Sequence, residues 1–301
     1  MSKISTLFRI IKKKDDLIAP LGANGFFNWM SDEQYLKLLY KATMHKRLNL
    51  ENPTTFNEKL QWLKIHDHNP EYTGWVDKIE AKKKIAKILG ERYVVPTLDQ
   101  WANAKDISFD NLPEQVVLKC NHDQGSVMII DDIKSISRDH IIKYYSSRLS
   151  RNPYPGTREY PYKYIKPFVF AEKYLEKSII DYKFYCFNGE PRFLYCGQGL
   201  TADHSLKIDF YDTNWKRMPF YRTDYMRLGN IPKPKCLEEM IEISKLLAKD
   251  VPFVRIDLFE VDGQVYFSEF TLCPASGFMP FVPEEYDHVV GEWLDLSSFR
   301  G

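Results

Sequence analysis

Residues 255–271 read RIDLFEVDGQVYFSEFT, the most informative segment of the chain. Two runs rich in β-branched and aromatic residues flank Asp262-Gly263, a pair typical of hairpin turns. Side chains along a strand alternate between its two faces. One face of the predicted hairpin therefore points into the core, and it carries Ile256, Leu258, Phe267 and Phe270. An antiparallel hairpin with one buried face and one polar face follows from this pattern.

The polar face of this hairpin carries the residues with the clearest chemistry. Arg255 and Asp257 share that face on the first strand, as do Glu269 and Thr271 on the second. With a loop of three residues, Asp262 to Gln264, Asp257 lies opposite Glu269 and Arg255 lies opposite Thr271. A two-residue loop breaks this alignment, so the pairing requires an odd loop or a bulge.

Two carboxylates opposed across a sheet repel each other unless a positive charge lies between them. Asp257 and Glu269 suit one or two Mg²⁺ ions, which take oxygen ligands and share their coordination shell with nucleotide phosphates. Arg255 beside them can hold a phosphoryl group or a developing oxyanion. An exposed network of arginine and carboxylates is the structural alternative, and the hairpin alone leaves both interpretations open.

A second group of candidate residues follows the apolar run at 116–118. Lys119 ends this predicted strand and precedes a polar loop that includes Gln124, Gly125 and Ser126. Such a loop offers backbone N–H groups to phosphate oxygens, with the lysine as a point charge. The loop lacks the glycine pattern of a Walker motif, and strands often end in lysine, so this pattern alone is weak.

Two later strands carry charged residues at positions that can face a ligand. Glu172-Lys173 interrupts a predicted strand over residues 168–175 and marks either a nucleotide-docking site or an edge strand. Asp181 and Lys183 share a face at the start of another predicted hairpin, with strands at 182–187 and 192–196. They point into the same cleft or pair with each other on the surface.

The rest of the chain predicts a mixture of helices and antiparallel strands. Residues 1 to about 75 are expected to be mostly helical, followed by a helix over 77–89. Further strands are expected at 92–96, 116–120 and 127–130, and further helices at 138–149 and about 237–247. The helix over 77–89 carries five lysines, which is typical of a solvated face: Lys78, Lys82, Lys83, Lys84 and Lys87. Without a regular βαβ rhythm, the pattern favours an α+β fold over a Rossmann fold.

Composition narrows the class of protein. Lys and Arg number 42 against 41 Asp and Glu, which argues against nucleic acid as a partner. Five cysteines without a CxxC pair argue against a disulfide framework or a zinc site and favour a cytoplasmic protein. No apolar run approaches the roughly 18–20 residues of a membrane span. Residues 1–14 lack a signal-peptide pattern; they either pack against the protein or lie as an amphipathic helix on an anionic membrane.

Taken together, these segments resemble the TupA-like ATP-grasp family, named for a protein of teichuronopeptide synthesis. The resemblance spans about residues 50–295. It rests on FNEKLQWL at 56–63, DK at 77–78, VLKCN at 117–121, AEKYL at 171–175, DYKF at 181–184, FNGEP at 187–191, and SEFT at 268–271 with Gly277. It implies an ATP-grasp fold in which two α+β subdomains clamp ATP. The implied parts are an N-terminal helical extension (1–75), a lid and phosphate-loop subdomain (76–170), and a core with hinge and metal-binding hairpin (171–301).

The resemblance also implies roles in nucleotide binding. Lys119 holds the α and β phosphates beneath a lid that includes residues 124–126, and Lys78 is an earlier nucleotide-contacting lysine. Glu172 contacts the adenine side, and the backbone of Lys173 and Leu175 forms the hinge.

The remaining implied roles lie nearer the reacting groups. Asp181 reaches the ribose, Lys183 contacts the phosphates or the acceptor, and Arg255 stabilises the transferring phosphoryl group. The implied Mg²⁺ ligands are Asp257, Glu269 and Thr271. The broader ATP-grasp fold usually has asparagine two residues after the metal-binding glutamate, where this chain has Thr271, and this makes a second metal ion less certain.

The implied activity is an ATP-dependent carboxylate–amine ligase that forms an acyl phosphate. Its expected partners are ATP, a uronic-acid-containing sugar or glycan of surface polysaccharide synthesis, a small amine or amino acid, and peripheral contact with membrane-bound polysaccharide machinery. Trp62, Tyr211 and Trp215 either stack on the sugar or pack in the core, and Cys273 is expected to pack or to contact the substrate rather than act as a nucleophile. A sugar kinase using the same cleft, a glycosyltransferase and an inactive nucleotide-binding scaffold are the alternatives.

Overall fold

The computed structural model describes residues 15–176, 179–199 and 205–297 of the 301. Residues 15–23 are helical, followed by α2 (Asp32–Met44), α3 (Phe56–His66), α4 (Tyr72–Val76), α5 (Lys78–Leu89), α6 (Arg138–Leu149), α7 (Tyr154–Thr157), α8 (Leu237–Ala248) and α9 (Tyr286–Glu292). The 3₁₀ helices are η1 (Glu91–Tyr93), η2 (Ala104–Asp106), η3 (Phe109–Asn111), η4 (Tyr160–Tyr162) and η5 (Pro274–Gly277).

Two sheets organise the molecule. The four-stranded sheet has the order β1 (Thr97–Trp101), β4 (Val169–Lys173), β2 (Val116–Cys120) and β3 (Met128–Ile130). The six-stranded sheet has the order β11 (Gln264–Thr271), β10 (Phe253–Val261), β5 (Ile180–Phe187), β6 (Glu190–Gln198), β7 (Lys207–Asp212) and β9 (Met226–Arg227). A small third sheet pairs β12 (Phe281–Val282) with β8 (Tyr221–Arg222).

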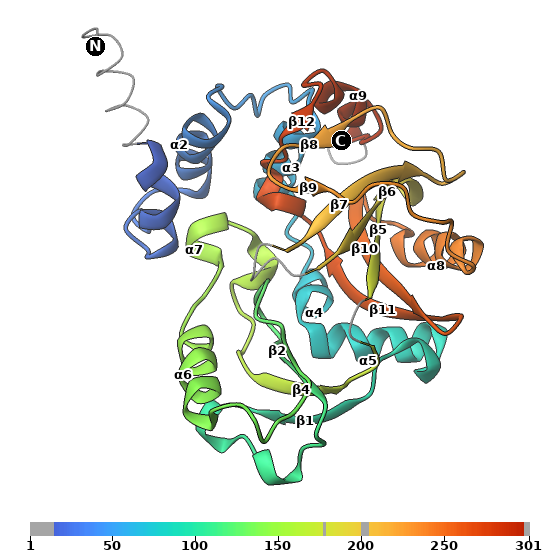
Figure 1. The fold of residues 1–301 in the computed structure, drawn as a ribbon. Helices are drawn as coiled ribbons and strands as arrows, with labels where there is room; N and C mark the ends of the chain where they lie inside the picture. The colour runs from blue at the N-terminus through green and yellow to red at the C-terminus, as the bar shows by residue number, and fades with distance from the viewer. Residues whose placement is uncertain (1–14, 177–178, 200–204, 298–301) are drawn as a thin grey trace, which may run out of the picture.

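The arrangement is the expected α+β fold. Within the described residues, β7 and β9 form the one parallel ladder, and the other ladders are antiparallel. Figure 1 shows the four-stranded sheet and α6 in one lobe, the six-stranded sheet and α8 in another, and α4 and α5 between them. The chain crosses from one sheet to the other between β4 and β5; the division into 1–75, 76–170 and 171–301 stays a prediction.

The hairpin of β10 and β11 has the predicted pairing but not the predicted loop. The loop of three residues is wrong, because the strands meet at Val261 and Gln264 across the two-residue turn Asp262-Gly263. Both turn residues have positive φ, 52° and 75°, the geometry that suits a tight hairpin. A bulge at Ser268 then restores the alignment, so Asp257 does lie opposite Glu269.

The second hairpin, β5 and β6, joins the first edge to edge. Strand β5 pairs with β10 in a register that places Lys183 beside Asp257 and Tyr185 beside Arg255. The polar face of one hairpin therefore continues onto the other, as the shared face of Asp181 and Lys183 suggested.

Two strand predictions near β1 are wrong. The predicted strand at 92–96 is replaced by η1 and an isolated bridge from Val94 to Phe267, and the strand β1 begins only at Thr97. The edge-strand interpretation of β4 also fails, because β4 lies between β1 and β2. Its charged pair therefore interrupts an interior strand, which is unusual without a specific partner for each charge.

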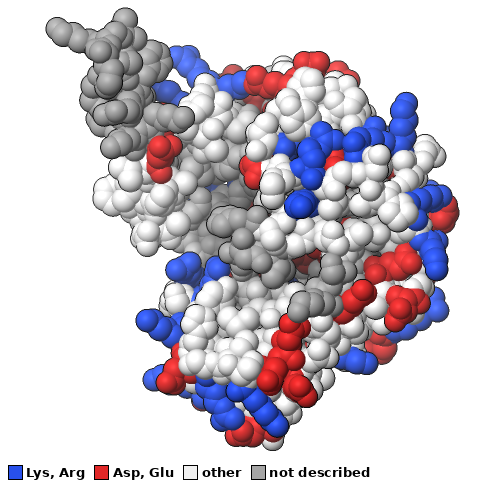
Figure 2. All heavy atoms as spheres, viewed as in Figure 1, with Lys and Arg blue, Asp and Glu red and all other residues white. Residues whose placement is uncertain are grey.

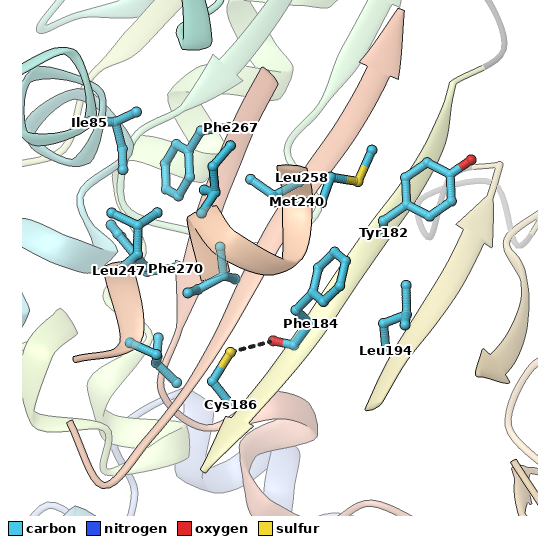
Figure 3. Packing of buried hydrophobic residues seen from close by; sticks show 14 of the residues in the cluster. Ile85, Tyr182, Phe184, Cys186, Leu194, Met240, Leu247, Leu258, Phe267 and Phe270 are labelled. Carbon is cyan, nitrogen blue, oxygen red and sulfur yellow. Dashed lines mark hydrogen bonds between the residues drawn. The ribbon is translucent and has the colours of Figure 1, made fainter. Parts of the chain in front are cut away.

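The hydrophobic core lies on both faces of the six-stranded sheet. On one face, α8 and α5 cover side chains such as Phe184, Leu258 and Phe267 (Figure 3). On the other face, α3 and α9 cover an aromatic cluster in which Phe56 contacts Phe253 at 5.0 Å between ring centroids. A separate core under the four-stranded sheet packs against α6.

The N-terminal helices are fixed to the remainder by specific contacts. Asn57 at the start of α3 donates its side-chain N–H groups to Met279 O at 2.9 Å and to Asp287 at 3.0 Å. Arg158 after α7 donates to Phe27 O at 2.9 Å. The expected helical character of the first 75 residues is confirmed for residues 15 onward, and residues 1–14 lie outside the described residues. No helix among the described residues is long and apolar enough to cross a membrane.

Candidate active site

The two joined hairpins bring five charged side chains together. Asp257 is fully buried, and Arg255 donates to both of its oxygens at 2.7 Å. Lys183 donates to the same carboxylate at 2.5 Å and lies 3.5 Å from Asp181. Glu269 lies farther from its partners, with one oxygen 3.4 Å from Arg255. The sequence-predicted hairpin residues thus form one cluster.

The electrostatics of this cluster depend on burial and on the surrounding cations. Burial alone raises the pKa of Glu269, but Lys78, Lys183 and Arg255 outweigh it and lower that pKa to about 2. Burial raises the pKa of Asp257, and the neighbouring cations oppose the rise. Burial lowers the pKa of Lys183, but Asp181 and Asp257 outweigh this effect and raise it overall. Glu269 is therefore anionic at neutral pH.

A second ionic cluster lies in the four-stranded sheet around Glu172. Both Lys119 and Lys82 contact this buried carboxylate, Lys119 at 2.5 Å. Burial raises the pKa of Glu172, but the two lysines outweigh it and lower the pKa. The expectation that Lys82 lies on a solvated face is wrong: its side chain is 7% exposed because it turns toward Glu172 and Thr97.

Helix α5 links the two clusters. Lys78 and Lys82 lie one turn apart, so they point from the same side of the helix. Lys78 lies 3.6 Å from Glu269 of the six-stranded sheet, whereas Lys82 contacts Glu172 of the four-stranded sheet. Lys78 also donates to Asp123 O, at 2.5 Å, in the predicted phosphate loop. One helix therefore presents a cation to each sheet and to the loop between them.

The start of α5 is itself fixed to the end of strand β2. Asp77 caps the helix by accepting from Ile79 N at 2.9 Å, and Asn121 donates to the second Asp77 oxygen at 2.8 Å. Asn121 also accepts from Phe168 N at 2.8 Å. These contacts hold Lys78 at a defined distance from the loop that follows Lys119.

The predicted phosphate loop is braced from within. Ser126 accepts from Cys120 N at 2.9 Å and donates to Asp123, so its hydroxyl serves the loop rather than pointing outward. Gly125 has φ +78° with open space where a Cβ would be, and Gln124 donates to Tyr162 at 3.4 Å. The loop is preformed next to Lys78, with Gln124 and Gly125 at its tip.

The predicted hinge residues follow Glu172 along the chain. Lys173 N donates to Pro96 O at 3.0 Å, and the Lys173 side chain is exposed. Leu175 is partly buried beyond the end of β4. Lys173 is the last residue of β4 and Leu175 lies on the connection from β4 to β5, and no contact identifies adenine as their partner.

The whole-chain comparison with known families agrees with this geometry. A family model described as TupA-like ATPgrasp matches residues 58–295. The chain belongs to the TupA-like ATP-grasp family. This confirms the family and the ATP-grasp fold that the sequence predicts, and it accords with the predicted class of enzyme, an ATP-grasp ligase. No curated protein sequence matches significantly.

Several solved ATP-grasp structures share part of the architecture at low identity. An L-amino acid ligase from Bacillus licheniformis is 11% identical with a TM-score of 0.46, covering 83% of this chain and 57% of that one. A D-alanine–D-alanine ligase from Bacillus anthracis, complexed with ATP, is 18% identical with a TM-score of 0.38, covering 65% and 54%. A D-alanyl-alanine synthetase A from Vibrio cholerae is 14% identical with a TM-score of 0.38, covering 72% and 62%. The chain spans between 54% and 62% of the length of these structures.

The donor set of this ATP-grasp site suits Mg²⁺. Glu269 is 23% exposed, and its contacts at 3.4 and 3.6 Å leave its oxygens accessible to a cation. Asp257 offers hard oxygen as well, but both of its oxygens already accept from Arg255. Thr271 is buried opposite Arg255. Among the described residues no group of three or more His, Cys, Asp and Glu is gathered for a metal.

A large cavity adjoins the predicted phosphate loop on the side of the N-terminal helices. It has a volume of about 1260 Å³ and reaches from Gln124 to Ser276, and Figure 2 shows the surface hollowed in this region. Its basic lining consists of Arg148, Arg151 and Arg222. The cavity therefore borders the predicted phosphate loop at Asp123 and Gln124.

The aromatic residues and the cysteine singled out in the sequence pack in or against the core. Trp62 and Tyr211 are 7% and 4% exposed, and Tyr211 stacks on Trp215 at 4.5 Å, so these aromatic residues pack in or against the core. Cys273 is buried, and burial raises the pKa of its thiol, as expected of a residue that is not a nucleophile.

Sequence reasoning missed two sets of residues. Lys82 was recoverable, because its spacing of four from Lys78 places both on one helix face. The buried residues Lys64 and Glu159 could not be predicted from the sequence. Lys64 donates to Ser276 O at 2.8 Å, and Glu159 accepts from Ser276 Oγ at 2.7 Å. These residues lie far apart in sequence, and no local pattern connects them.

Proposed function

We propose that the chain is an ATP-dependent ligase that joins an amine to a carboxylate and releases ADP and phosphate. The observation that carries the proposal is the cluster in which Asp257 and Glu269 meet Arg255, Lys183 and Lys78. Transfer of a γ-phosphoryl group depends mainly on positioning and on fixed charges near the transferring oxygens. Family membership supports the same class of reaction.

In this proposal the nucleotide binds beside the cluster of Glu172, Lys82 and Lys119. One lysine is enough to balance this carboxylate, and Lys119 is the more exposed of its two partners, at 20% against 7% for Lys82. Lys119 can therefore turn to the α and β phosphates while Lys82 keeps Glu172 anionic and in place. Residues 173–175 and Asp181 would receive the adenine and ribose, and residues 124–126 would close over the phosphates with Lys78.

In this proposal the γ-phosphoryl group lies beside the charged residues of the two hairpins. Mg²⁺ held by Glu269 and Asp257 would offset phosphate charge and polarise the γ-phosphoryl group. Asp257 fixes Arg255 by a two-pronged contact, which leaves the guanidinium aligned for the phosphoryl oxygens. Lys183, held between two carboxylates, keeps its charge beside the same point.

The proposed reaction proceeds in two steps. A carboxylate oxygen attacks the γ-phosphorus, the bond to the bridging oxygen breaks, and ADP leaves. The amine, after losing a proton, attacks the carbonyl carbon of the acyl phosphate, and phosphate leaves with one of the former carboxylate oxygens. The products are an amide, ADP, phosphate and one proton released to solvent.

We further propose that the carboxylate belongs to a uronic-acid sugar or glycan. The cavity volume, about 1260 Å³, exceeds the roughly 300–1,000 Å³ of sites for drug-sized ligands and suits an extended substrate. Within the described residues Arg151 has no ion-pair partner, so it offers a charge to the substrate carboxylate. Tyr225 and Phe278 in the lining offer apolar surface to a sugar ring.

Trapping with hydroxylamine tests this reaction without knowledge of the natural amine. The protein is incubated with Mg-ATP, hydroxylamine and a panel of uronic acids, their glycosides and their nucleotide-linked forms. The proposal predicts hydroxamate, ADP and free phosphate in equal amounts, all lost in Arg255→Met. Phosphate retained on the sugar indicates a kinase, and nucleotide-sugar turnover without ATP indicates a glycosyltransferase; either result contradicts the ligase.

A further inference from the structure

The charges that line the large cavity are paired with one another, with two exceptions. Six charged residues line it: Asp123, Arg148, Arg151, Glu159, Arg222 and Asp224. Arg148 lies 3.5 Å from Asp123, and Arg222 lies 2.5 Å from Asp224. Among the described residues, neither Arg151 nor Glu159 has an ion-pair partner. Since Arg151 can meet a substrate carboxylate, Glu159 is the charge in the cavity that remains without a counterpart.

Glu159 is a buried carboxylate with no cation in contact. It is 4% exposed, and Ser276 Oγ donates to it at 2.7 Å. The cation that acts on it is Lys64, but Lys64 Nζ donates to Thr157 O at 2.9 Å and to Ser276 O at 2.8 Å. Burying a charge is costly unless it is paired. A buried carboxylate that lines a cavity without an ion pair therefore points to a ligand that supplies the missing positive charge.

The backbone that carries Ser276 is held in an unfavourable conformation. Ala275 and Ser276 have φ of 50° and 49°, the left-handed region that residues other than glycine seldom adopt. Gln61 of α3 donates to Ser276 O at 2.9 Å and to Gly277 O at 2.8 Å, so it fixes this turn together with Lys64. Strained residues that their surroundings hold in place are concentrated at functional sites. Here the strained turn sets the Ser276 hydroxyl against Glu159 at the wall of the cavity.

Tyr162 connects Glu159 to the proposed phosphate site. The Tyr162 hydroxyl accepts from Gln124 of the predicted phosphate loop at 3.4 Å. Burial raises the pKa of Tyr162, and the carboxylates of Glu159 and Glu269 add to this rise, so both act on the same hydroxyl. Glu159 therefore lies on the side of the cavity that faces the hairpin carrying Glu269.

We propose that Glu159 binds the ammonium group of the amine substrate in the large cavity and takes one of its protons. An aliphatic amine is protonated at neutral pH and cannot attack in that form. A carboxylate that first pairs with the ammonium and then accepts a proton serves both needs. Burial raises the pKa of Glu159, against the opposing effect of Lys64, and so makes the carboxylate a better proton acceptor. The inference rests on the proposed ligase reaction.

The proton transfer fits the balance of that reaction. Glu159 accepts one proton from the ammonium and becomes neutral, and the free amine attacks the carbonyl carbon of the acyl phosphate. The bond between that carbon and the phosphate oxygen breaks, and phosphate leaves with a second proton from the nitrogen. Glu159 then returns its proton to solvent, and this is the one proton that the reaction releases.

Competition between two nucleophiles for the acyl phosphate tests the assignment. Hydroxylamine is uncharged at neutral pH and needs no proton acceptor before it attacks, whereas methylamine is almost wholly protonated. The protein is supplied with Mg-ATP, the carboxylate that gives hydroxamate, and both nucleophiles, and mass spectrometry gives the ratio of methylamide to hydroxamate. Acetyl phosphate in the same buffer gives the ratio in the absence of a protein site. The wild-type protein should exceed that ratio by at least about tenfold.

Three variants show whether the ratio depends on Glu159. Glu159→Gln should lower it at least about tenfold, while ADP release with hydroxylamine alone falls by less than about threefold. Glutamine has the shape of glutamate and can still accept from Ser276, so this split reports on the charge and not on the turn. Ser276→Ala keeps the carboxylate but removes its hydrogen bond, and should lower the ratio by a smaller factor. The matched control, Asp224→Asn, removes another carboxylate of the same cavity and should keep the wild-type ratio. Unchanged urea midpoints confirm that the variants are folded.

Three results overturn the inference and leave the ligase reaction standing. The first is a wild-type ratio no higher than that of acetyl phosphate, and the second is a ratio that Glu159→Gln and Ser276→Ala leave unchanged. The third is an equal loss of methylamide and hydroxamate in Glu159→Gln, which would show that Glu159 only supports the turn. A wild-type protein that forms no hydroxamate overturns the proposed ligase reaction itself, and this inference with it.

Discussion

Replacing Lys82 with methionine tests whether the Glu172 cluster is built as described. The side chains of Lys82 and Glu172 are each 7% exposed, so the substitution removes one charge of a buried ion pair. Removing one partner from such a pair costs about 3–5 kcal/mol when the other charge is left uncompensated. Here Lys119 stays on Glu172 at 2.5 Å, so we expect a smaller loss in the free energy of unfolding, about 2 kcal/mol.

Methionine keeps the apolar stem and has a helix propensity close to that of lysine, so the change isolates the charge. The measurement is urea unfolding at neutral pH. Lys83→Met is the matched control, because Lys83 is the next residue on the same helix, is 68% exposed and, among the described residues, forms an ion pair with nearby Glu80 alone. It should cost no more than about 0.5 kcal/mol.

A double-mutant cycle makes the test specific. In a Glu172→Gln background the buried negative charge is gone, so Lys82→Met should cost less than in the wild type, with a coupling of about 1 kcal/mol or more. If Lys82→Met destabilises no more than Lys83→Met, or costs the same in both backgrounds, Lys82 is not a partner of Glu172 and the link from α5 to the four-stranded sheet is wrong.

Three other predictions concern Glu269, the turn of the β10–β11 hairpin, and the hydrogen bonds that Asn57 of α3 makes to Met279 and Asp287. The pKa of Glu269 is lowered to about 2, so its contribution to stability is present above its unfolded pKa of about 4.5 and lost as the pH falls to 2. The difference in the free energy of unfolding between wild type and Glu269→Gln should therefore shrink between pH 4.5 and pH 2. A difference that does not change with pH contradicts this. Asn57→Ala should cost about 3 kcal/mol in urea unfolding, because it leaves the buried oxygens of Met279 and Asp287 without these hydrogen bonds. Asn103→Ala, at an exposed position, should cost under about 1 kcal/mol. Equal costs would show that the Asn57 hydrogen bonds contribute nothing special. Gly263→Ala should destabilise by about 1 kcal/mol because of its positive φ, whereas Gly74→Ala should not, and a neutral Gly263→Ala refutes the turn geometry.

The sequence predicted the charged cluster because hairpin geometry is local. Alternation of side chains placed Arg255 and Asp257 on one face and Glu269 and Thr271 on the facing strand, and the Asp262-Gly263 pair located the turn. The predicted loop of three residues was wrong, because the turn has two residues and a bulge at Ser268 supplies the extra one. Such a bulge depends on packing across the sheet rather than on the turn sequence. The bulge that the sequence left open as the alternative to an odd loop gives the same register, so Asp257 still lies opposite Glu269.

Long-range contacts were beyond local patterns. The burial of Lys82 depends on strand β4, ninety residues away, lying inside its sheet with Glu172 turned toward α5. The predicted strand at 92–96 failed because its apolar residues pack beside β11 through one isolated bridge rather than in a ladder. Propensity alone does not distinguish these outcomes, since tertiary packing decides both.

Calorimetric titration with Mg-ATP tests the central claim, that the two ionic clusters form one nucleotide site. We expect magnesium-dependent binding that Lys119→Ala and Glu269→Gln each weaken by more than about tenfold, or ~1.4 kcal/mol, with Lys83→Met binding as the wild type does. No binding by the wild type, or binding that neither Lys119→Ala nor Glu269→Gln changes, would contradict the account.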